Sequence, residues 1–141
     1  MSGNISFGSS ISDYNNFVMT GDNVKATGNI MSLIDGENFD SSTNLIISSF
    51  TFSKTFQGCT SLTTAPALPA TTLADNCYNY MFYRCSKLNS IEVAFTSWNT
   101  NCTEDWVNGT TSLGTFTCPT SLLEQRGTSY IPENWTIVRK Q

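Results

Sequence analysis

The side chains best suited to chemistry in this sequence are five cysteines and eleven acidic residues. No two of the cysteines, Cys59, Cys77, Cys85, Cys102 and Cys118, form a C-x-x-C pair, so neither a zinc ribbon nor a dithiol redox motif is indicated. Histidine is absent. Its absence removes the commonest general base and metal ligand, and every Ser-His or Cys-His nucleophile pair. We therefore predict that the chain is not an enzyme and has no catalytic residues.

The carboxylates do not form a convincing site either. Residues 35–40 (DGENFD) are the only acid-rich stretch, and they lack the remaining EF-hand spacing, so a turn is favoured over a calcium site. Asp75 is expected to cap a helix. The adjacent Glu104 and Asp105 are expected to cap a helical turn over residues 101–106 rather than act as a pair. We predict no metal and no cofactor. A hydrolase that uses carboxylates alone stays as an alternative, which would require two acids facing one cleft.

The cysteines instead mark a repeat. Residues 56–62 and 82–88 share the pattern F-x-x-C-[ST]-x-L, 26 residues apart, and residues 39–45 form a degenerate copy with Ser42 in the cysteine position. Each copy runs on as an approximate L-x-x-L-x-L. A period of 20–29 residues that carries this pattern is typical of a leucine-rich repeat.

Each repeat unit predicts a short strand over the L-x-x-L-x-L segment and, in the segment before it, a short helix on the opposite side. Pro66 and Pro69 are expected to end the strand that follows Leu62 and to turn the chain. The helix is expected over residues 75–85, where apolar residues recur at i, i+4 spacing. These residues are Cys77, Met81 and Cys85 on one row and Tyr78 and Phe82 on the other.

Cys59 and Cys85 occupy equivalent positions in neighbouring units. A ladder of small buried thiols is favoured over a disulfide or metal pair, because a serine fills the same position in the first copy. A disulfide between Cys102 and Cys118 is the alternative if the chain is exported.

The fold class predicted for the 141 residues is an α/β solenoid in one domain, a short leucine-rich-repeat-like stack of strands with short helices. Residues 1–35 are expected to form a strand-rich N-terminal cap, residues 36–97 the repeat coils and residues 98–141 a strand-rich C-terminal cap. Within the caps, strands are predicted at 17–20, 24–27, 114–117 and 135–138, with a turn near Gly127 and with Trp106 and Trp135 covering the last coil.

The composition excludes two kinds of partner. Ser, Thr and Asn make up 52 residues, whereas charged residues make up 13% and the net charge is −4. The few basic residues are scattered, so no nucleic acid is expected as a partner, and no basic amphipathic helix favours a membrane surface. No apolar run is long enough for a transmembrane helix, and no signal peptide is visible at the start.

Residues 59–85 resemble the BspA-like leucine-rich repeats of gut anaerobes and their phages, and residues 28–33 and 103–109 resemble segments that flank such repeats. The resemblance implies an adhesion or recognition surface on a cell envelope or a phage fibre, without enzymatic activity. The chain departs from the pattern because it has only two clear repeats and no export signal.

The expected ligand-facing residues are the strand positions between the buried ones, together with two tyrosines that can supply binding area. These residues are Thr63, Thr64, Asn89, Ser90, Glu92, Tyr80 and Tyr83. The predicted function is a cell-surface or extracellular binding and adhesion module for a protein or glycan ligand. The alternative is a phage virion component, such as a fibre tip or a capsid decoration protein. Self-association into a homo-oligomer through an open sheet edge, or assembly into a larger particle, is a further expectation.

Overall fold

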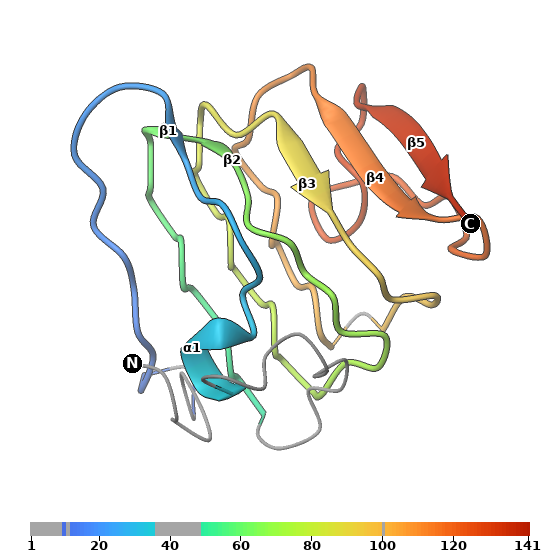
Figure 1. Ribbon diagram of the computed structural model, residues 1–141, viewed down its shortest axis with the longest axis horizontal. Coiled ribbons are helices and arrows are strands. Elements are labelled where there is room, and N and C mark those ends of the chain that lie inside the picture. Colours follow the sequence, from blue (N-terminus) through green and yellow to red (C-terminus); the bar gives the residue numbers. More distant parts are fainter. Residues whose placement is uncertain (1–9, 11, 36–48, 100) are drawn as a thin grey trace.

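The computed structural model describes residues 10, 12–35, 49–99 and 101–141. This part of the chain forms a five-stranded parallel sheet with very little helix, so the strand-rich expectation is confirmed (Figure 1). The strands lie side by side in chain order. They are β1 (Val24–Lys25), β2 (Leu62–Thr64), β3 (Ser90–Glu92), β4 (Thr115–Pro119) and β5 (Thr136–Lys140), and helix α1 covers Ser32–Asp35.

The register of the sheet follows the spacing of the sequence repeat. Thr64 in β2 pairs with Ser90 in β3, 26 residues later, and Ser90 pairs with Thr115 in β4. Leu62 and Leu88, the repeated leucines, are both fully buried. The prediction that these two leucines occupy equivalent interior positions is therefore confirmed.

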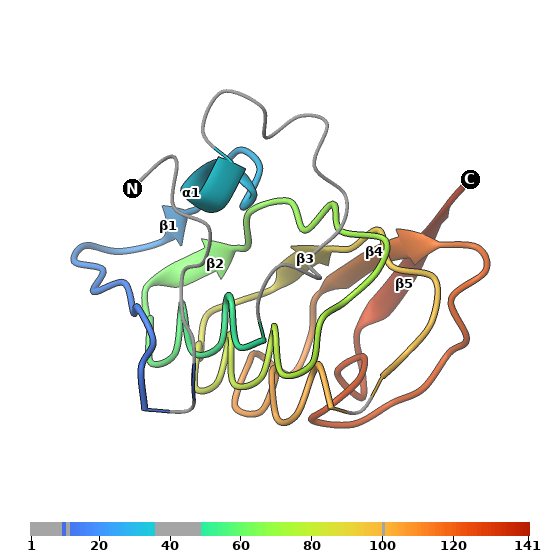
Figure 2. The same ribbon diagram turned by 90° about the horizontal axis from the view of Figure 1, so that it is seen from below.

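A second ladder of backbone hydrogen bonds runs along the side of the molecule opposite the sheet (Figure 2). It joins residues 50–59, 76–85 and 101–109, which we call the turn segments. Alternate N–H groups of one turn segment donate to carbonyls of the next. Examples are Phe52 N–H to Cys77 O (2.9 Å), Phe56 N–H to Met81 O (2.9 Å), Tyr78 N–H to Cys102 O (2.9 Å) and Phe82 N–H to Trp106 O (2.9 Å).

The predicted short helix at 75–85 is wrong, because these residues form consecutive turns. Asn76, Tyr80 and Arg84 have positive φ values of 59°, 55° and 60°, which no α-helix accommodates. The turns close with bonds three residues apart, such as Met81 N–H to Tyr78 O (3.0 Å). The left-handed residue recurs every four positions, and this period produces the same i, i+4 apolar spacing as a helix. Asp75 therefore caps no helix.

The other predicted local elements are partly right. Strands β1, β4 and β5 lie within or overlap the predicted strands at 24–27, 114–117 and 135–138, and a turn at Gly127 is closed by Tyr130 N–H on Gly127 O (3.1 Å). The predicted strand at 17–20 is wrong, since this stretch makes no strand pairing in the sheet. The predicted helical turn at 101–106 is also wrong. Asp105 there has φ 47° and belongs to the third turn segment.

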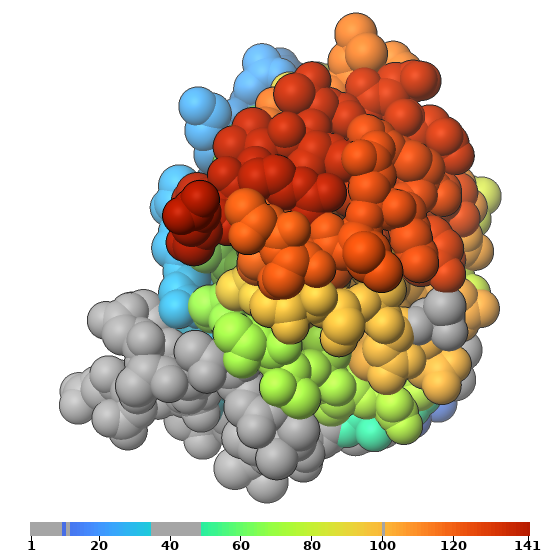
Figure 3. Space-filling view, turned by 90° about the vertical axis from the view of Figure 1, so that its right-hand side faces the viewer, coloured from blue at the N-terminus to red at the C-terminus, as the bar shows by residue number. Residues whose placement is uncertain are grey.

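The stacking extends further in both directions than the sequence repeat. On the N-terminal side, Phe17 lies beside Phe56 and Val24 pairs with Leu62. The degenerate copy at 39–45 lies outside the described residues. On the C-terminal side the ladder continues past Trp98 through the third turn segment. Figure 3 shows the later part of this order as red, orange, yellow and green bands that follow one another.

Aromatic rings stack through the interior between the sheet and the turn segments. Phe17, Phe56, Phe82 and Trp106 form one row, with ring centroids 5.2, 5.7 and 6.0 Å apart from one ring to the next. Trp106 is fully buried, and Trp135 is nearly so, with its indole N–H on the Thr111 carbonyl (2.9 Å). Each unit of the chain thus contributes a ring that its neighbours cover.

Candidate functional site

The outer face of the sheet carries rows of small polar side chains in register. The register places Lys25, Thr64, Ser90, Thr115 and Thr136 in one row across all five strands. A second row crosses the last three strands and consists of Glu92, Thr117 and Val138. We call these two rows the outer rows.

Strand geometry explains why these residues face outward. Successive side chains of a strand alternate between the two faces. In β3 and β4 the residues between the outer rows, Ile91 and Phe116, are buried in the core. Because neighbouring parallel strands lie about 4.8 Å apart, the Cα atoms of Thr64, Ser90 and Thr115 follow one another at about this spacing. A hydroxyl both donates and accepts hydrogen bonds, so a row of such residues can match a polar ligand along its length.

Charge on this face is sparse and partly paired. The Glu92 carboxylate accepts a hydrogen bond from Lys140 Nζ at 2.5 Å, and both side chains are about half exposed. An exposed pair of this kind contributes little to stability. Val138 is 42% exposed and adds an apolar contact at the edge of the second row. The face is therefore mainly neutral and hydroxyl-rich.

Three of the seven predicted ligand-facing residues, Thr64, Ser90 and Glu92, lie in the outer rows. Thr63 is half-buried, as Thr64 and Ser90 also are, and its hydroxyl donates to the Val24 carbonyl (3.1 Å), so it links β2 to β1. Asn89 is exposed just before β3.

The structure does not bring the two predicted tyrosines to this face. Tyr80 and Tyr83 belong to the second turn segment, on the opposite side of the molecule, where their rings meet edge to face at 5.7 Å. Desolvation and the neighbouring Glu104 carboxylate raise the pKa of Tyr80. The guanidinium of Arg84 lies 5.2 Å from the Tyr83 ring centre. The seven residues thus divide between two faces and do not form one site.

Sequence reasoning missed the C-terminal half of the outer rows. Thr115, Thr117, Thr136 and Val138 follow the same period-two alternation around the inward-facing Phe116 and Ile137. This alternation was the signal that could have found them. The strands were predicted, but they were assigned to a cap rather than to the surface.

The cysteines are all buried and free, which matches the ladder interpretation for Cys59 and Cys85. The Cys59 thiol donates to the Phe17 carbonyl (3.1 Å), and the Cys85 thiol donates to the Phe56 carbonyl (2.9 Å). Each thiol thus ties its turn segment to the preceding part of the stack.

The alternative disulfide between Cys102 and Cys118 is wrong. Cys102 lies in the third turn segment, where its thiol donates to the Ala74 carbonyl (3.0 Å). Cys118 lies in strand β4 and accepts a hydrogen bond from Arg139 (3.3 Å). The two sulfurs therefore belong to the two different ladders.

Burial raises the pKa of the Cys85 thiol from 9.0 to about 12. The folded state therefore holds this thiol neutral, and the resulting stability is fully present below pH 9, where the unfolded thiol is also protonated. It is lost progressively as pH rises from 9 towards 12, because the unfolded state releases the proton first. We expect the urea midpoint of the wild type to fall over this range, and that of Cys85→Ala to fall less steeply. If the urea midpoint falls equally steeply with pH in the two proteins, the Cys85 thiol does not cause the loss of stability.

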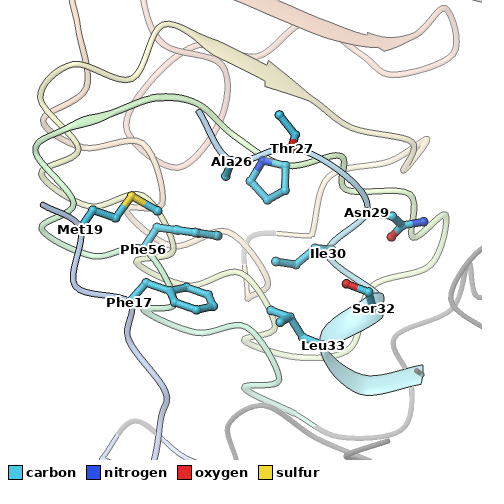
Figure 4. A pocket seen from close by; sticks show the side chains of 10 residues that line it. Phe17, Met19, Ala26, Thr27, Asn29, Ile30, Ser32, Leu33 and Phe56 are labelled. Carbon is cyan, nitrogen blue, oxygen red and sulfur yellow. The ribbon is translucent and has the colours of Figure 1, made fainter. Parts of the chain in front are cut away.

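A pocket of about 240 Å³ opens near the N-terminal end of the stack (Figure 4). Its lining is mainly apolar, with Phe17, Phe56, Ile30 and Leu33 among the side chains. Asn29, its most polar member, accepts the Met31 N–H on Oδ1 (2.8 Å). None of the residues that line this pocket is acidic, and Thr27 and Ser32 contribute its hydroxyl groups.

The remaining acidic candidates do not form a site among the described residues. No group of three potential metal ligands occurs in this part of the chain. Glu104 is exposed, and the Asp105 N–H donates to the Ser129 hydroxyl (3.0 Å). Most of the acid-rich stretch at 35–40 lies outside the described residues. The helices that the structure describes include none that is long and apolar enough to span a bilayer.

The chain matches no protein-family model, and comparison with curated proteins and with solved structures likewise gives no match.

Proposed function

We propose that this chain is a non-enzymatic binding or adhesion module, built as a short leucine-rich-repeat-like solenoid of the BspA-like type. Its outer rows present hydroxyls to a protein or glycan ligand. The in-register alignment of these rows, one across all five parallel strands and one across the last three, is the observation that carries the proposal.

The solenoid part of the proposal is supported by three features that coincide. The strands follow one another in chain order, the turn segments form a second ladder in the same order, and Phe56 and Phe82 stack on each other. In a solenoid each unit contacts only its neighbours and buries its apolar face against them. Both ladders fit this arrangement.

The binding part of the proposal is supported by the shape and chemistry of the outer rows. Small-molecule sites are usually concave and mostly apolar with a few polar groups. The outer rows instead extend across the sheet, and five of their eight side chains are Thr or Ser hydroxyls. An extended surface of this kind suits a macromolecular ligand that makes many small polar contacts.

The proposal that the chain has no catalytic activity is supported by the contact that Glu92, the acidic residue of the outer rows, makes. Glu92 is engaged by Lys140 rather than set against a second carboxylate. Glycoside hydrolysis by carboxylates needs two such groups placed around one reacting bond.

The proposal can be tested by probing the purified chain on a printed glycan array and on an array of purified extracellular proteins. Thr117→Lys places a long charged side chain in the centre of the outer rows, where Thr117 pairs with both Glu92 and Val138. We expect it to weaken binding at least tenfold while the circular dichroism spectrum stays unchanged.

Two variants serve as controls. Ser121→Lys makes the same charge change at an exposed position after β4 and is expected to bind like the wild type. Tyr83→Ala tests the opposite face. If Tyr83→Ala abolishes binding and Thr117→Lys does not, the ligand binds the turn segments, and the proposed surface is wrong.

A further inference from the structure

Strand β5 is the outermost strand of the sheet, and one side of its backbone faces away from the other strands (Figure 1). On the side toward β4, Thr136 N–H donates to Gly114 O (2.8 Å), and the pairing continues through the whole of β5. Successive residues of a strand direct their N–H and C=O groups to opposite sides. The backbone groups of Ile137 and Arg139 therefore point away from β4, and within the described ranges no hydrogen bond reaches them.

The side chains of β5 are less covered than those of the inner strands. Ile137 is in register with Phe116 and Ile91 and faces the core as they do, but it is half-buried whereas they are buried. The reason is that β3 and β4 have a neighbouring strand on each side, and β5 has one. Val138, at the centre of β5, is 42% exposed on the outer face. A further strand beside β5 would cover both apolar side chains.

The charged residues of β5 are held by their own chain. Proteins often protect an edge strand from pairing by means of charged side chains that project from it. The Arg139 guanidinium, however, donates to the carbonyls of Pro119 and Leu122, and Lys140 Nζ binds the Glu92 carboxylate. Neither cation is left free to repel a strand that approaches this edge.

Strand β1, at the other edge of the sheet, is a poor partner for β5. It is two residues long, and its register with β2 shifts between Val24 and Lys25. Val24 N–H donates to Ser61 O in the direction of β2, so Lys25 is the residue whose backbone groups point outward, and its side chain is exposed. A short, irregular and charged edge resists pairing. Head-to-tail stacking of β5 on β1 of another copy is therefore disfavoured.

We propose that β5 pairs antiparallel with β5 of a second copy of this chain, around a two-fold axis at Val138. In this register Ile137 of each copy and Arg139 of the other form a hydrogen-bonded pair, so every outward N–H and C=O of these residues is used. The two Val138 side chains meet on the outer face. Thr136 lies opposite Lys140 of the second copy, so no like charges face each other.

The symmetry of this pairing has a consequence for the outer rows. A two-fold axis that relates two antiparallel strands is perpendicular to their sheet, so the outer rows of both copies lie on one face of a continuous sheet. The pairing itself does not depend on whether these rows bind a ligand. A single pair of short strands covers much less than the roughly 800 Å² per partner of a standard interface. We therefore expect a weak dimer, with a dissociation constant on the order of 100 μM.

The test is sedimentation equilibrium of the full chain from about 10 μM to about 1 mM, a range that spans the expected dissociation constant. The average mass is expected to rise from that of one chain toward that of two. Val138→Lys places two ammonium groups against each other at the axis and is expected to raise the dissociation constant at least about tenfold. Thr117→Lys makes the same charge in the same row, one strand further in, and is expected to dimerise like the wild type.

This control keeps the dimer separate from the proposed function, because Thr117→Lys is expected to lose ligand binding and to keep the dimer. A second measurement, amide hydrogen exchange of the wild type at low and high concentration, holds even if Val138→Lys does not fold. Ile137 and Arg139 are expected to gain protection at high concentration, and Lys25 is not. A monomer throughout, a Val138→Lys dimer of wild-type strength, or protection at Lys25 in place of Ile137 and Arg139 would overturn the proposal.

Discussion

Replacing Trp106 by alanine is expected to destabilise the fold by about 3–5 kcal/mol, the range for a large aromatic side chain removed from a core. Trp106 is fully buried, and its ring contacts Tyr78, Phe82 and Phe116, which come from both ladders. Its indole N–H donates to the Tyr130 carbonyl (2.9 Å), which is left unpaired in the variant. Guanidinium unfolding followed by circular dichroism measures the loss.

The matched control is Leu113→Ala, because Leu113 is 70% exposed. It is expected to change the unfolding free energy by less than about 0.5 kcal/mol. If Trp106→Ala lowers the free energy of unfolding by less than about 1 kcal/mol, the Trp106 ring does not pack between the two ladders as described.

The second large effect is expected for Gly114→Ala. A Cβ at this position would lie 2.6 Å from the Trp135 ring and 2.7 Å from the Asn89 carbonyl oxygen. Neither neighbour can move freely, because Asn89 O accepts the Thr115 N–H (2.9 Å) and the Trp135 indole donates to Thr111 O. We expect a loss of about 1–3 kcal/mol, as for an overpacked core position.

The effect of Gly114→Ala should be local to the C-terminal strands. Amide hydrogen exchange is expected to accelerate in β4 and β5 and to stay unchanged in β2. Ser112→Ala, an exposed change two residues away, serves as the control. Wild-type stability in Gly114→Ala would show that β4 does not approach Asn89 and Trp135 this closely.

The features that the sequence predicted well are those in which the same side chain recurs in the same environment. Leu62 and Leu88 must both reach the interior for the 26-residue repeat to bury its apolar residues, and both do. Cys59 and Cys85 fill a small position beside the preceding backbone, and both thiols donate to a phenylalanine carbonyl there.

The error at 75–85 has a specific cause. Tyr80 and Arg84 are not glycines, so their left-handed conformation could not be inferred from residue type. The period of four residues between these turns is close to the 3.6 residues of an α-helix. Over two turns the apolar pattern does not distinguish an α-helix from consecutive turns of this kind. The hydrogen bonds to the neighbouring segments do distinguish them.

The end of the stack was missed because the stacking there does not depend on the repeated residues. Phe17 lies 39 positions before Phe56 rather than 26. Trp106 occupies the place after Phe82 although it is a different aromatic residue. The C-terminal residues of the outer rows were missed for the same reason. Thr115 and Thr136 follow the preceding row members at spacings shorter than the 26 residues between Thr64 and Ser90.

The two ladders are tested most directly by nuclear Overhauser spectroscopy on the labelled chain, since both join residues about 25 positions apart. The ladders predict backbone contacts between Thr64 and Ser90 and between Ser90 and Thr115 in the sheet, and between Phe52 and Cys77 in the turn segments. Helical contacts within 75–85, or sheet contacts at a different register, would contradict them.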